Sequence, residues 1–138
     1  MLVYAHREDA PRHADYRAWL EGLLGSPEPY GVADVVLSGF LRVVTHPRVF
    51  AEPTPLGEAL AFCAALRGRP NAVVVTPGAR HWRLFTDLCE RANVRGNLVP
   101  DAYLAALAIE SGSTWATADR DYSRFPGLTL AHLPVEQK

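Results

Sequence analysis

The sequence predicts an α/β fold built on a mainly parallel sheet. Apolar residues recur at helical spacing in five segments, and short β-branched segments stand between them. Strands that are separated by helices need crossover connections, which make neighbouring strands parallel. We therefore expect helices to cover the faces of a parallel sheet.

Length and composition predict one domain over residues 1–138. Of the 138 residues, 49% are hydrophobic and 21% are charged, close to the averages of globular proteins. Turn residues are spread evenly along the chain, with no linker-like or repeated segment. These features exclude a disordered chain and a collagen-like repeat.

Helical periodicity places the five helices at residues 11–24, 33–44, 54–67, 79–92 and 100–112. Thr54 and Pro55 are typical of a helix start, and Gly112 is typical of a helix end.

β-Branched residues predict buried strands at residues 72–75 and 114–117. A short third strand is expected at 128–130, and the opening residues 1–5 have the pattern of the tail of a strand. These strands would complete the parallel sheet.

Two cysteines, Cys63 and Cys89, cannot form a disulfide framework, and a buried apolar role is the better interpretation for Cys63. No apolar run approaches the roughly 20 residues of a membrane span, and no secretory signal is readable. The sequence thus predicts a cytoplasmic protein that does not bind membranes. The net charge of the chain is −1, and 13 of the 14 basic residues are arginine.

The motifs of several enzyme classes are absent. The sequence has no phosphate-binding glycine loop, no G-x-S-x-G elbow and no H-E-x-x-H pair. The five histidines lie apart in the sequence, which argues against a zinc site.

Carboxylates in the last third of the chain form the candidate site. Asp101 begins an apolar helix, while Asp119 and Asp121 directly follow the expected strand 114–117. A helix antiparallel to the next strand brings its start to the edge where that strand ends, and ligands bind at this edge. Carboxylate oxygens without histidine or thiolate favour Mg²⁺ or Mn²⁺. Each aspartate also has an ordinary structural explanation, as a charge at a helix start or as a turn residue.

Several segments together resemble one family, the PIN-domain ribonuclease toxins, which are the VapC-like toxins of bacterial toxin–antitoxin systems. The resemblance is carried by residues 97–110 (NLVPDAYLAALAIE), 116–122 (ATADRDY), 125–128 (FPGL), 2–7 (LVYAHR) and 40–50 (FLRVVTHPRVF). It covers essentially the whole chain.

The resemblance implies a Rossmann-like three-layer α/β/α sandwich and Mg²⁺-dependent cleavage of RNA by a homodimer, inhibited by a cognate antitoxin. By position, Asp101 and Asp119 would be metal ligands and Asp121 an outer member of the acidic cluster. Thr117 would orient a carboxylate or the water. Such a site would hold the metal against the scissile phosphate and activate a bound water.

Two departures from the family concern its acidic residues. The family opens with a strand that carries Asp-x-Asn just before its Leu-x-Tyr-Ala, and here Met1 stands after the place of that Asn. The first strand is thus expected to be truncated, and a misassigned start is one hypothesis for it. An acidic residue that many relatives carry on the second helix is Gly39 here, with Asp34 one turn earlier as a poorly aligned substitute.

Arginines are the candidates for RNA binding. Arg42 and Arg48 flank the family-like turn at residues 45–47 and are the first choice. Tyr16 and Trp19 are expected to belong to the core or to a protein interface. The further candidates for RNA contacts are Arg80, Arg83, Arg95, His46 and His81.

Two other interpretations remain open at this point. The chain would be a catalytically weakened PIN-like domain that binds antitoxin or RNA if the missing Asp leaves the metal site incomplete. It would be an unrelated α/β enzyme for small molecules only with a cofactor motif, and the sequence shows none.

Overall fold

The computed structural model describes residues 1–133. These residues form two compact units, residues 1–75 and residues 76–133, and each is described by itself. All strand pairs in both units are parallel, which confirms the α/β class with parallel strands. Among these residues, no helix is both long enough and apolar enough to cross a membrane.

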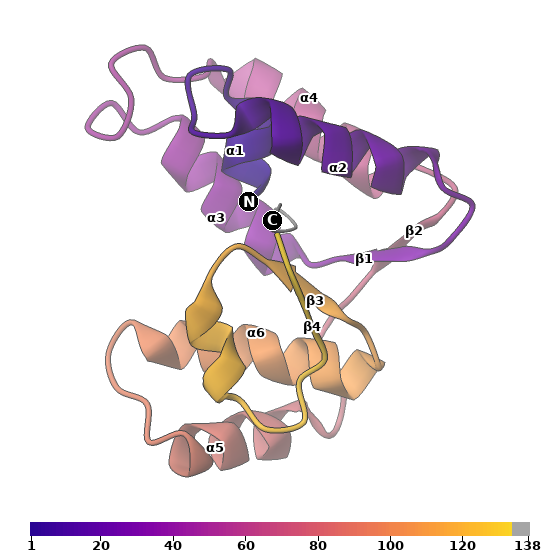
Figure 1. Cartoon of the computed structure of the whole chain (residues 1–138), viewed down its shortest axis with the longest axis vertical. Helices are drawn as coiled ribbons and strands as arrows, with labels where there is room; N and C mark the ends of the chain where they lie inside the picture. The colour runs from indigo at the N-terminus through magenta and orange to yellow at the C-terminus, as the bar shows by residue number, and fades with distance from the viewer. Residues whose placement is uncertain (134–138) are drawn as a thin grey trace, which may run out of the picture. The chain divides into compact units, whose positions relative to one another are not determined.

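Unit 1 consists of four helices and one pair of strands (Figure 1). Strands β1 and β2 pair in register, with Tyr30 opposite Ala72. Three buried side chains of α3, those of Leu37, Phe40 and Val44, form part of its core. The elements are α1 (Leu2–His6), α2 (His13–Gly25), β1 (Tyr30–Val32), α3 (Asp34–Val44), α4 (Leu56–Arg67) and β2 (Ala72–Val74).

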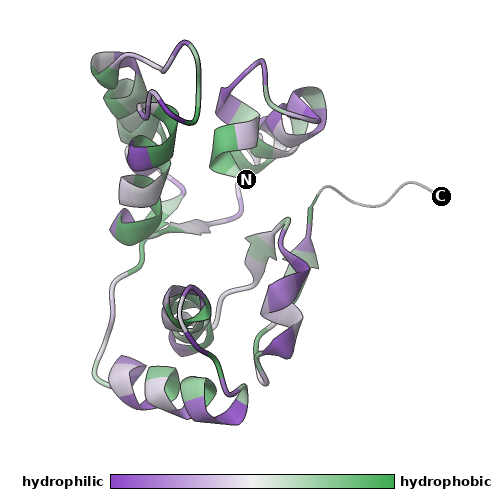
Figure 2. Ribbon diagram, turned by 90° about the vertical axis from the view of Figure 1, so that its left-hand side faces the viewer, coloured by the Kyte–Doolittle hydropathy of each residue, from purple (hydrophilic) through white to green (hydrophobic). Residues whose placement is uncertain are grey.

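Unit 2 consists of α5 (His81–Arg91), α6 (Leu98–Ser111), β3 (Trp115–Thr117), the 3-10 helix η1 (Arg120–Arg124) and β4 (Leu130–His132). Helix α5 is amphipathic, and its ribbon in Figure 2 carries both hydrophilic and hydrophobic residues. Alanines of α6 pack with Leu88 of α5 and with Tyr122 and Phe125. Small alanine side chains allow close packing at the start of α6, where Asp101 lies.

The predicted helices agree with the observed ones to within two residues at either end, and Gly112 ends α6 in the left-handed conformation, at φ 68°. The expected capping by Thr54 is wrong. Helix α4 begins after Pro55, and the buried Thr54 hydroxyl instead accepts a hydrogen bond from Arg7. A long-range partner therefore replaces the local one.

The opening residues are a helix rather than the tail of a strand. In α1, the amide of Ala5 donates to the Met1 carbonyl and the amide of Arg7 donates to the Val3 carbonyl. Ala5 is fully buried on the inner side of this turn. A turn of helix satisfies these backbone groups locally, whereas a strand needs a neighbour.

Two strand predictions need correction. Val73 and Val74 are exposed, so the predicted burial of residues 72–75 is wrong. The last strand begins two residues later than expected, because the ladder with β3 starts where the Trp115 amide donates to the Thr129 carbonyl. Strand β1 was not predicted, since three residues between Pro29 and a helix carry no periodic signal.

Glu110, near the end of α6, holds the segment that leads into α5. Its carboxylate accepts hydrogen bonds from the amides of Gly78 and Arg80, at 2.8 and 3.0 Å. These two backbone bonds lower the pKa of Glu110. The carboxylate thus fixes the segment just before α5 to the end of α6.

Candidate functional site

Asp101 lies in the first turn of α6, partly buried beside Tyr122. The Tyr122 hydroxyl donates a hydrogen bond to Asp101 Oδ1 at 3.1 Å. Tyr122 belongs to η1, which directly follows the loop after β3. The start of α6 and the carboxyl end of β3 therefore meet, as the order of elements predicts.

Asp119 lies between β3 and η1, where two hydrogen bonds from backbone amides hold it. Its amide donates to Thr117 Oγ1 at 3.0 Å, and its Oδ1 accepts from the amide of Asp121 at 2.8 Å. Asp119 is thereby the capping residue of η1. Thr117 is buried at the end of β3, where its hydroxyl fixes the backbone that carries Asp119.

The two carboxylates share one property. Each uses Oδ1 for a hydrogen bond within the protein, while Oδ2 of Asp101 and of Asp119 has no hydrogen-bond or ion-pair partner among residues 1–133. Within residues 1–133, the site therefore presents one carboxylate oxygen without a partner from Asp101 and one from Asp119.

The surroundings of Asp101 disfavour the negatively charged form of its carboxylate. Burial raises the pKa of Asp101, and the charges of Asp119 and Asp121 raise it further, against the hydrogen bond from Tyr122, which lowers it. Burial and the neighbouring Asp101 raise the pKa of the Tyr122 phenol, so this hydroxyl stays protonated. A cation at the open oxygens would relieve the repulsion between the carboxylates.

Asp121 lies at the outside of this cluster. Its side chain is exposed and pairs with Arg124 Nη2 at 3.5 Å. Its amide, rather than its carboxylate, contacts Asp119. The Asp121 carboxylate therefore pairs with Arg124 and not with the other two aspartates.

The donor set fits a hard divalent cation. Within the described part of the chain, no group of three or more His, Cys, Asp or Glu side chains gathers around one point. Mg²⁺, however, keeps several waters and is commonly held by one or two carboxylates together with substrate phosphates. The open oxygens of Asp101 and Asp119 match that pattern.

Arg42 and Arg48, the predicted RNA contacts, lie in unit 1. Arg42 is in the last turn of α3, and Arg48 is in the loop that follows it. Both are exposed, and neither forms an ion pair within residues 1–133. The Arg48 amide donates to His46 Nδ1, which shapes this loop.

Other predicted candidates have structural roles. His81 is 3% exposed and its Nε2 hydrogen-bonds the Tyr103 carbonyl, so it is not a surface contact for RNA. Asp34 forms an ion pair with Arg67, at 2.8 Å. Tyr16 and Cys63 are buried, as expected.

Sequence reasoning missed Tyr122. It belongs to the motif at residues 116–122 but received no role there, because an aromatic residue after a turn usually belongs to the core. The available signal was its hydroxyl, since a buried tyrosine needs a polar partner.

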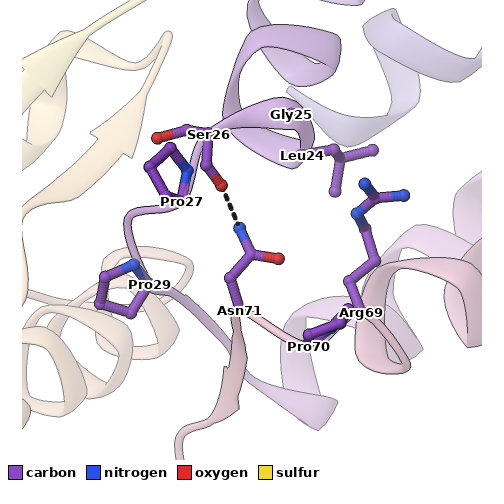
Figure 3. A pocket seen from close by; sticks show the side chains of 8 residues that line it. All are labelled: Leu24, Gly25, Ser26, Pro27, Pro29, Arg69, Pro70 and Asn71. Carbon is purple, nitrogen blue, oxygen red and sulfur yellow. Dashed lines mark hydrogen bonds between the residues drawn. The ribbon is translucent and has the colours of Figure 1, made fainter.

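A separate hollow of about 600 Å³ opens in unit 1 (Figure 3). Asn71 donates to the Ser26 carbonyl at 2.8 Å on one side, and Arg69 reaches along the other. None of the predicted site residues lines this hollow. Its lining residues are Leu24, Gly25, Ser26, Pro27, Pro29, Arg69, Pro70 and Asn71.

Comparisons with known proteins show the family to which the chain belongs. The PIN domain family model matches residues 1–128. The chain is 48% identical to VapC ribonuclease Mb2897 of Mycobacterium bovis over 132 residues, which are 96% of this chain and 90% of that protein. It is 40% identical to Ribonuclease VapC31 of Mycobacterium tuberculosis over 135 residues, 98% of this chain and 95% of that protein.

A solved structure has the same fold. The crystal structure of VapBC2 from Rickettsia felis, bound to a DNA fragment from their promoter, matches with a TM-score of 0.66 at 20% identity. The match covers 94% of this chain and 91% of the other. The chain therefore belongs to the PIN-domain family and, within it, to the VapC-like toxins.

Proposed function

We propose that this chain is an endoribonuclease toxin of a toxin–antitoxin system, which hydrolyses RNA phosphodiester bonds at a Mg²⁺ site held by Asp101 and Asp119. The observation that carries the proposal is the pair of open carboxylate oxygens at the junction of α6 and β3. The relatives, named VapC ribonucleases, support the choice of RNA as substrate.

In this mechanism, Asp101 and Asp119 would hold the cation through their carboxylates, and Thr117 keeps the Asp119 backbone in place. When bound, Mg²⁺ or Mn²⁺ lowers the pKa of a coordinated water and neutralises charge on the phosphoryl oxygens. Asp121 adds negative potential from outside the ligand pair. Arg42 and Arg48 contact the RNA backbone, because both guanidinium groups are exposed and free of carboxylate partners within residues 1–133.

The proposal extends to the protein partners of the chain. We expect a homodimer in the cytoplasm that a cognate antitoxin inhibits, as membership of the VapC-like toxins suggests. Coexpression with the antitoxin encoded beside it would then relieve the growth arrest that this chain causes alone.

One observation favours a second candidate, a PIN-like domain that binds antitoxin or RNA with little cleavage. Residues 1–133 contain no metal-binding group of three acidic or other ligating side chains. A site with two carboxylates holds Mg²⁺ more weakly than one with three or more.

Cleavage of a broad RNA pool, with and without Mg²⁺ or Mn²⁺, separates the two candidates. The proteins to compare are the chain itself, Asp101→Ala and, as matched control, Asp87→Ala, which removes an exposed aspartate of the same unit. We expect cleavage that EDTA abolishes, that Asp101→Ala lowers by more than about 100-fold and that Asp87→Ala leaves unchanged.

A fourth protein, with an Asp-x-Asn segment added before Met1, tests whether a third carboxylate is needed. Cleavage by this protein alone would mean that two carboxylates do not suffice. Absence of cleavage from all four proteins would favour the binding domain.

A further inference from the structure

The Tyr122 hydroxyl has a single hydrogen-bond partner within residues 1–133, and that partner is Asp101 Oδ1 at 3.1 Å. The tyrosine is 5% exposed, so the hydroxyl has left bulk water. A buried phenol needs a polar partner, and here the partner is the carboxylate proposed to hold the metal. The bond joins η1 to the first turn of α6.

The ring that carries this hydroxyl is held in place by its neighbours. Its centroid lies 5.3 Å from that of Trp115 and 5.9 Å from that of Phe125. Tyr122 also belongs to the same buried cluster as Ala102, the residue after Asp101. The hydroxyl therefore stays at a fixed position relative to α6.

The packing does not require the hydroxyl. A phenylalanine ring would make the same contacts with Trp115 and Phe125, so the oxygen contributes only through its bond to Asp101. That bond occupies Oδ1, fixes the rotation of the carboxylate and leaves Oδ2 open. The last side-chain torsion of an aspartate has only broad intrinsic preferences, so a hydrogen bond is needed to define it.

We infer that Tyr122 is a positioning residue, whose hydroxyl orients the Asp101 carboxylate so that Oδ2 faces the divalent cation. This inference rests on the proposed function, because it assumes that Asp101 is a metal ligand. Groups that hydrogen-bond to a ligating carboxylate set its direction, and their loss typically lowers metal affinity 10–100-fold.

Binding of Mn²⁺ to the metal-free chain, followed by electron paramagnetic resonance, tests the inference without an activity assay. The variants are Tyr122→Phe, Asp101→Ala, the double variant and the control Tyr103→Phe. Tyr103 lies on α6 and contacts His81 and Phe85 through its ring, with no hydrogen bond from its hydroxyl within residues 1–133. Thermal unfolding of every variant is recorded in parallel.

We expect Tyr122→Phe to raise the Mn²⁺ dissociation constant about 10-fold, and Tyr103→Phe to leave it unchanged. In the Asp101→Ala background, removal of the Tyr122 hydroxyl should have no further effect, because its partner is gone. RNA cleavage by Tyr122→Phe should need more metal and recover its maximal rate at saturating Mn²⁺. A loosened core would instead weaken binding in both backgrounds.

Two results would overturn the inference, and they differ in meaning. Full Mn²⁺ affinity in Tyr122→Phe, together with lost affinity in Asp101→Ala, would reject the role of Tyr122 and leave the metal site standing. Unchanged affinity in Asp101→Ala would reject the metal site itself, and with it the proposed function.

Discussion

Arg7 in unit 1 and Asp101 in unit 2 are both partly buried ionisable groups, but their surroundings are opposite. The Arg7 guanidinium binds the Asp9 carboxylate through two nitrogens, at 2.9 and 2.6 Å. It also donates to the Glu52 carbonyl at 2.8 Å and lies 4.0 Å from the centre of the Phe50 ring. Within residues 1–133, Asp101 accepts one hydrogen bond, from a neutral donor, and its charged neighbours are two carboxylates and the more weakly acting Arg124.

The comparison separates a charge that joins parts of the fold from one that we propose to bind a ligand. A buried charge whose three nitrogens all donate hydrogen bonds joins parts of the fold, and Arg7 joins the end of α1 to residues 50–54 of the loop before α4. A buried carboxylate beside like charges is a cost to the fold. Proteins keep such unfavourable carboxylates at binding sites, where a ligand supplies the positive charge that balances them.

Arg7→Ala gives the largest expected loss of stability. The change removes hydrogen bonds to Asp9, Glu52 and Thr54 and exposes the face of Phe50. We expect the free energy of unfolding to fall by about 2–3 kcal/mol, measured by urea denaturation. Arg17→Ala is the matched control, since its ion pair with Glu21 is exposed and should contribute less than about 0.5 kcal/mol. Equal losses of stability in the two variants would show that Arg7 contributes no more to the fold than an exposed ion pair does.

Asp101→Asn should act in the opposite direction. Asparagine keeps an acceptor for Tyr122 and removes a charge that burial and Asp119 disfavour. At pH 7 in EDTA, we expect the variant to be more stable than the parent by about 0.5–1 kcal/mol, the range of other stabilising changes at strained sites. Added Mg²⁺ should raise the melting temperature of the parent alone. A less stable variant in EDTA would show that Asp101 has a structural role.

The smallest effect concerns His6, which lies between Phe40, Phe62 and Thr54 in unit 1. Burial lowers the pKa of His6 below its ordinary value of 6.5, and Glu58 only partly opposes this. The unfolded chain therefore takes up a proton first, and stability is lost as the pH falls through 6.5.

Urea denaturation at pH 8 and pH 5.5 measures this loss. It should be no more than about 1 kcal/mol, since one unit of pKa shift corresponds to about 1.4 kcal/mol. In His6→Gln the loss should shrink. A variant that keeps the whole pH dependence would place its source elsewhere.

Local signals predicted most of the helices and failed for the short strands. Helix α3 repeats its apolar residues over 11 residues, which is enough to define the period. Strand β1 has three residues, Tyr30–Val32, and exists because its backbone pairs with that of β2, about 40 residues later. The opening turn Leu2–His6 was misread for the same reason, since five residues do not define a period.

The sequence by itself determined the α/β class and, to within two residues, the bounds of the long helices, and it placed Asp101 in the first turn of α6 and Asp119 directly after β3. These features follow from periodicity and chain direction, which local residues specify. Only the tertiary structure decided that Tyr122 donates to Asp101 across 21 residues and that Arg7 reaches Glu52 across 45. Side-chain hydrogen bonds between distant segments depend on how the core packs. Residues that meet through packing are not separated by any regular interval along the chain, so no sequence pattern predicts them.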